Sequence, residues 1–125
     1  MRKLLIIAAA LMVVALPATA LASRSATRSE KKQLKSAVTK SKLVTRSVRK
    51  GHFKLVKPRV SSAGPWARAY VVPSDTYSDP FNAPRGLFKR KHGTWKLVAL
   101  SLHRVGCSHP KAPKAVRSDL KLRCG

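Results

Sequence analysis

Two cysteines and two nearby histidines are the residues of this 125-residue chain that come nearest to a chemical motif. Cys107 and Cys124 are the only cysteines, and His103 and His109 flank the first of them. Together they suggest a metal site, but their spacing matches no standard zinc pattern, and a Cys-x-His pair places its side chains awkwardly for one ion. A lone pair of cysteines in an exported chain normally forms a disulfide. The sequence therefore predicts a Cys107–Cys124 disulfide, no metal site and no cofactor.

Acid–base catalysis needs a positioned base and an orienting acid, and acids are scarce in this chain. The four acidic residues are Glu30, Asp75, Asp79 and Asp119. Glu30 is explained as a helix cap, Asp75 and Asp79 as turn residues, and Asp119 as a solvated residue of a last helical turn. A secreted basic nuclease would use His92 or His103 with one aspartate, but nothing in the sequence pairs them. We predict no catalytic residues, and a nuclease-like hydrolase is the first alternative function.

The charge of the chain is its most extreme property. Lys and Arg total 27 against four acids, which gives a net charge of +23. So large an excess of one sign attracts polyanions such as nucleic acid, acidic envelope polymers or an anionic membrane surface. We predict a non-enzymatic protein that binds these partners by electrostatics. The expected binding residues are Lys54, Lys57, Arg68, Lys89, Arg90, Lys91 and Lys96.

Aromatic residues lie among these basic positions and allow two interpretations. Trp66, Tyr70, Phe88 and Trp95 alternate with Lys and Arg, as on a surface that stacks bases. A domain this small needs its tryptophans inside, so we expect a core instead. The expected core residues are Trp66, Val72, Phe88, Trp95 and Leu97, packed with Leu34 and Val38. A second alternative function, a cationic membrane-active protein, would use an amphipathic helix within residues 34–48, whose apolar face is small.

The first 22 residues have the pattern of a secretory signal peptide. Arg2 and Lys3 precede an apolar run over residues 4–16, and small residues follow Pro17. Cleavage is expected after Ala22 or Ala20, because both sites fit the small-x-small pattern. We therefore predict a secreted, extracellular or cell-envelope protein with a basic flexible leader at residues 23–28 and one domain at residues 29–125.

The domain divides into one helix, about four strands and a short last helix. Thr27 and Glu30 form a capping box that predicts a helix over residues 28–41. Strands are expected at 52–60, where Pro58 requires an edge or a bulge, and at 66–72, whose one face is small. Residues 86–102 read as a hairpin turning at 91–94, and residues 112–122 as a short helix.

These elements predict an α+β fold: an N-terminal helix on an antiparallel sheet of about four strands, with a short C-terminal helix stapled by the disulfide. The signal peptide, the helix, the Trp66-Ala67 strand start, the Gly93-Thr94-Trp95 hairpin and the late cysteine pair resemble small secreted proteins of uncharacterised function from high-GC Gram-positive bacteria. The resemblance implies a cystatin-like or NTF2-like layout and no catalytic residues.

Overall fold

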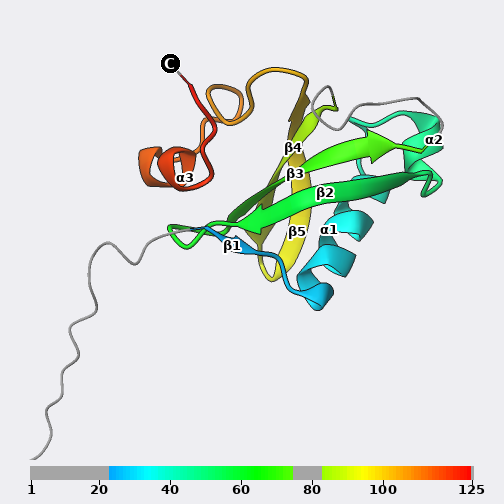
Figure 1. Ribbon diagram of the computed structural model, residues 1–125, viewed down its shortest axis with the longest axis horizontal. Coiled ribbons are helices and arrows are strands. Elements are labelled where there is room, and N and C mark those ends of the chain that lie inside the picture. The colour runs from blue at the N-terminus through cyan, green and yellow to red at the C-terminus, as the bar shows by residue number, and fades with distance from the viewer. Residues whose placement is uncertain (1–22, 75–82, 125) are drawn as a thin grey trace, which may run out of the picture.

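Within residues 23–74 and 83–124, the part of the chain that the computed structural model describes, five antiparallel strands form one sheet in the order β1-β2-β3-β4-β5 (Figure 1). The predicted signal peptide, Asp75 and Asp79 lie outside these residues. The elements are β1 (Arg24–Ser25), α1 (Arg28–Thr39), α2 (Arg46–Arg49), β2 (Phe53–Val60), β3 (Trp66–Pro73), β4 (Arg85–Lys91), β5 (Thr94–Ser101) and α3 (Lys114–Asp119).

Helix α1 begins where the capping box predicts it. The Thr27 hydroxyl accepts a hydrogen bond from the backbone N–H of Glu30 at 3.1 Å, and the Glu30 carboxylate accepts one from the N–H of Thr27 at 2.9 Å. Leu34 and Val38 lie one turn apart and are buried, so they fix the face that packs against the sheet. The helix ends at Thr39, two residues before the predicted end.

Strand β2 carries the bulge that Pro58 predicts. Val56 lies opposite Tyr70, but the register shifts before Arg59, which lies opposite Arg68. Lys57 adopts a φ of 51° at this shift. Proline has no N–H to donate to the ladder, so the strand bends at Pro58 and continues one residue out of register.

The β4–β5 hairpin turns at two residues, His92 and Gly93. Their φ angles are 53° and 77°. Two consecutive positive φ values characterise the tight turn whose twist matches the flanking strands. His92 is therefore a turn residue, as the sequence predicts.

The sheet buries apolar side chains on both faces, and strand β3 shows the division. Ala67, Ala69 and Val71 face α1 and α2, whereas Trp66 faces α3. The helix-side core consists of Ala26, Leu34, Ala37, Val38, Val44, Val48, Phe53, Val60, Ala67, Ala69, Val71, Phe88, Trp95 and Leu97. The C-terminal core consists of Trp66, Leu87, Val105, Ala112, Val116, Leu120 and Leu122.

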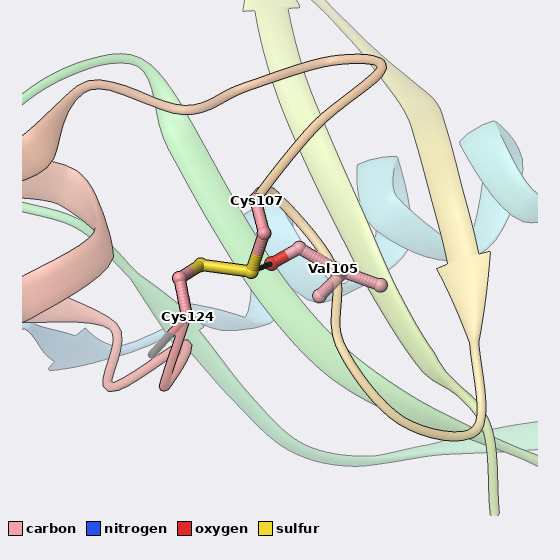
Figure 2. The surroundings of a disulfide bond; sticks show 3 residues. All are labelled: Val105, Cys107 and Cys124. Atoms are coloured by element: carbon pink, nitrogen blue, oxygen red, sulfur yellow. Dashed lines mark hydrogen bonds between the residues drawn. A yellow bond between two sulfur atoms is a disulfide. The ribbon is translucent and has the colours of Figure 1, made fainter.

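Helix α3 and the segments around it lie away from α1 and α2 (Figure 1). A disulfide joins Cys107, before α3, to Cys124, after it, across 17 residues (Figure 2). Val105, two residues before Cys107, is buried in the C-terminal core. The predicted disulfide and the antiparallel α+β fold are confirmed.

Three expectations require correction. The sheet has five strands because Arg24 and Ser25, placed in the expected flexible leader, pair with Val60 and Arg59 of β2. Trp66 is buried, but in the C-terminal core rather than with Leu34 and Val38, because it points to the opposite face of the sheet from its neighbour Ala67. Val72 is buried as expected, but among the described residues it is not part of the cluster that contains Leu34 and Val38.

Candidate functional site

Positive charge dominates the described part of the chain. Of the 27 Lys and Arg residues, all but Arg2 and Lys3 lie within it, together with only two acids, Glu30 and Asp119. Arg24 donates to both carboxylate oxygens of Glu30, at 2.6 and 2.8 Å, in the one ion pair formed among the described residues. The hydrogen bond from Arg24, assisted by those from Thr27, lowers the pKa of Glu30 to about 2.

Asp119 forms hydrogen bonds that hold two parts of the fold together. Its Oδ2 accepts hydrogen bonds from the Ser61 hydroxyl at 2.7 Å and from the backbone N–H of Ser62 at 2.8 Å. The prediction of a solvated residue is therefore wrong, because the β2–β3 turn folds back onto the end of α3. Asp119 ties these two elements together and neutralises no cation through an ion pair in the described residues.

Four of the predicted binding residues cluster at the β4–β5 hairpin. Lys89 and Lys96 lie opposite each other, and Lys91 is exposed beside the turn. The Lys89 ammonium lies 5.1 Å from the ring centre of Trp66, and the Arg90 guanidinium lies 5.4 Å from that of Trp95. Since Trp66 and Trp95 belong to different cores, Lys89 and Arg90 point to opposite faces of the sheet.

Trp66 of β3 and the hairpin residues Phe88 and Trp95 are unavailable for base stacking. Trp66 and Trp95 are each only 4% exposed, and Phe88 is completely buried. A base needs an open ring face to stack on. The core interpretation of these three residues is confirmed, and any anion contacts here come from the cations.

The other predicted residues lie on β2 and β3. Lys54 and Lys57 are exposed, whereas Arg68 is half-buried and donates its Nε–H to the backbone oxygen of Leu120 at 2.6 Å. Burial lowers the pKa of Arg68 from its ordinary value; the nearby Tyr70 opposes this shift, and the positive charges of Arg85 and Arg59 add to it.

Arg59 was not among the binding residues predicted from the sequence. The β2 bulge places it opposite Arg68, where two like charges oppose each other across the ladder. Its Nε–H donates to the Ser23 hydroxyl at 3.1 Å and its Nη1–H to the Ser25 hydroxyl at 3.2 Å, while Nη2–H donates to the backbone oxygen of Ser23. The sequence signal was a proline within the strand followed by an arginine, which indicates a bulge. That signal does not reveal which residue lies opposite the arginine on the neighbouring strand.

Arg59 and Arg68 share a pocket of about 400 Å³ at the β1–β2 side of the sheet. Its other lining residues are Ser25, Lys31, Lys57 and Pro58. Arg59 also lines a neighbouring hollow of about 460 Å³, which reaches Ser118 and Asp119 at the end of α3. The hairpin cations and this pocket are therefore two separate concentrations of positive charge.

The described residues hold no group of three His, Cys, Asp or Glu side chains that is arranged to bind a metal. They also contain no helix with the length and apolar character to cross a membrane. No family model, curated protein or solved structure matches the chain.

Proposed function

We propose that this chain is an exported, non-enzymatic protein that binds anionic polymers, either of the cell envelope or extracellular nucleic acid, by electrostatics. The observation that carries the proposal is the unbalanced charge: two acids accompany 25 Lys and Arg in the described residues, and one ion pair forms among them. A polyanion carries a condensed layer of small cations, and Lys and Arg side chains release these when they bind its charged groups.

The two alternative functions find less support in the same residues. An amphipathic helix must offer its apolar face to a membrane, but Leu34, Ala37 and Val38 of α1 are buried in the helix-side core. A nuclease needs a histidine joined to an acid, but among the described residues His92 forms the hairpin turn and Asp119 is bonded to Ser61 and Ser62; Asp75 and Asp79 lie outside these residues.

The test is a salt-dependent titration of the full chain with DNA, a heparin-like polymer and a teichoic-acid-type polymer, together with an RNA cleavage assay. We expect tight binding at low salt, weakening by about 0.9 in log affinity per phosphate contact for each decade of salt. Changing Lys91 and Lys96 to Gln should reduce this slope by nearly 2 if both contact the polymer.

A matched control changes two exposed residues, Lys111 before α3 and Lys114 at its start, to Gln, which lowers the net charge equally. A smaller loss of slope in this variant would place the contacts at the hairpin. Absence of binding at low salt would refute the proposal. RNA cleavage that is lost when one His or Asp is changed, with the fold intact, would replace it with the nuclease.

A further inference from the structure

We propose that the pocket at the β2 bulge is a specific site for a dianionic tetrahedral oxyanion, such as the terminal phosphate group of an anionic polymer. The pocket is lined by Ser25, Lys31, Lys57, Pro58, Arg59 and Arg68. This inference rests on the proposed function, because it names the chemical group by which such a polymer is held.

The first argument is the pair of guanidinium groups. Arg59 and Arg68 lie directly opposite each other on neighbouring strands and line the same pocket. Like charges at opposed positions destabilise a sheet, and none of the described residues that line the pocket carries a carboxylate that could compensate them. An oxyanion bound between the two guanidinium groups removes this repulsion.

The second argument is how the two arginines are held. Arg59 donates three hydrogen bonds to the hydroxyl and carbonyl oxygens of Ser23 and Ser25, and Arg68 donates its Nε–H to the carbonyl of Leu120. These acceptors are neutral, so they fix the guanidinium groups without cancelling their charge. A guanidinium has five N–H donors, so both residues keep donors for a ligand. Side chains ordered before binding lose less entropy when the ligand arrives.

The third argument is the β-bulge. In an unshifted register Arg59 would lie opposite Ala67, whose side chain faces α1 in the helix-side core. The shift after Val56 turns Arg59 to the opposite face, beside Arg68. Bulges commonly redirect a side chain in this way at functional sites. The non-glycine residue Lys57 takes a positive φ of 51° to make the bulge.

The fourth argument is the balance of charge and size. Lys31 of α1 and Lys57 of the bulge bring the lining to four basic side chains. This charge favours a dianionic phosphate monoester over a monoanionic phosphodiester. A volume of about 400 Å³ exceeds that of one tetrahedral oxyanion, so the first atoms of an attached chain also fit.

The experiment titrates the full chain, with its disulfide intact, with methyl phosphate and separately with dimethyl phosphate. At about pH 7.5 the monoester is largely dianionic, because its second pKa is about 6. Binding is followed through the NMR signals of the Nε–H groups of Arg59 and Arg68. We expect saturable shifts of both signals with methyl phosphate, and at least tenfold weaker binding of dimethyl phosphate.

Two kinds of variant test the residues. Arg68→Lys keeps the net charge but loses the planar donor fork, so methyl phosphate should bind about tenfold more weakly. Lys31→Ala should weaken binding about threefold or more, while Lys32→Ala, its neighbour outside this pocket, should not. Lys31 and Lys32 are both exposed, so this pair decides the question even if Arg68→Lys unfolds the protein.

Equal binding of the two esters, or equal effects of Lys31→Ala and Lys32→Ala, would overturn the site. Its failure is distinguishable from failure of the proposed function. Polymer binding at low salt without saturable binding of methyl phosphate would refute the site alone. Saturable methyl phosphate binding without polymer binding would refute the polyanion proposal and leave the site standing.

Discussion

Single residues show how the few acids of this chain are used. Asp119 bonds the β2–β3 turn to α3, and Glu30 caps α1 while it pairs with Arg24. Both described acids therefore stabilise the fold, and neither is among the lining residues of the pocket that Arg59 and Arg68 share.

The pKa of Glu30 leads to a prediction for the acid stability of the protein. Its folded pKa, about 2, lies below the ordinary value of 4.5, chiefly because Arg24 bonds to the charged form. The stabilising contribution is therefore complete above about pH 4.5 and is lost as the pH falls towards about 2. Glu30→Gln keeps an acceptor for the Thr27 N–H but carries no charge.

We expect Glu30→Gln to lower the free energy of unfolding by on the order of 1 kcal/mol near neutral pH and by much less near pH 2. Urea unfolding of both proteins across this pH range measures the difference. Arg24→Gln is the matched control. When Arg24 is replaced in this way, Glu30→Gln should change the free energy of unfolding by less. A difference that stays constant with pH would show that Glu30 acts without its charge.

Elements with a local signal were predictable. The capping box of Thr27 and Glu30 marks the start of α1, and the His92-Gly93 turn marks the hairpin, because both depend on residues that are neighbours in sequence. The small face of β3, with Ala67 and Ala69, likewise follows from simple alternation. The disulfide was predictable because only two cysteines exist.

Elements fixed by distant contacts were not predictable. Strand β1 consists of two polar residues, so it has no alternation of apolar and polar positions. The strand is held against β2 in part by hydrogen bonds from the Arg59 side chain to Ser23 and Ser25. The pairing of Arg59 with Arg68 depends on a one-residue bulge, and one residue of register reverses which face a side chain occupies. The candidate pocket was therefore only partly predicted from the sequence. Lys57 and Arg68 were predicted as binding residues, while Arg59 and Lys31 were not.

The C-terminal element yields a prediction about the disulfide. The Cys107–Cys124 bond closes a 17-residue loop that contains α3 and most of the C-terminal core. Replacing both cysteines by Ser should lower the free energy of unfolding by about 2–4 kcal/mol, because the unfolded chain regains the entropy of the open loop. Thermal unfolding with and without reductant measures this, and the double variant should not respond to reductant. An unchanged melting curve would show that packing alone holds α3.

At the scale of the whole molecule, both faces of the sheet contribute to an apolar core, and the charge is carried outside them. Leu34 and Val38 cover one face, and Val116 and Leu120 cover part of the other. The chain can therefore fold while most of its Lys and Arg side chains remain in solvent. The fold accommodates the charge but does not cancel it.

This arrangement predicts that salt stabilises the protein. With a net charge of +23 and one ion pair among the described residues, repulsion between like charges opposes the compact state. Raising NaCl from about 0.01 M to about 1 M shortens the screening length from about 30 Å to about 3 Å. The Tm should therefore rise with NaCl, in a buffer free of phosphate and sulfate that would also occupy the proposed site.

The variant with Lys91 and Lys96 changed to Gln is the control for this prediction. These side chains are exposed at the hairpin, so their loss lowers the net charge with little effect on packing. Its Tm at low salt should be higher than that of the unchanged protein, and its rise with NaCl should be smaller, because less repulsion remains to be screened. A Tm that falls with NaCl in both proteins would show that attractive pairs outweigh repulsion, and the premise of a free cationic surface would fail with it.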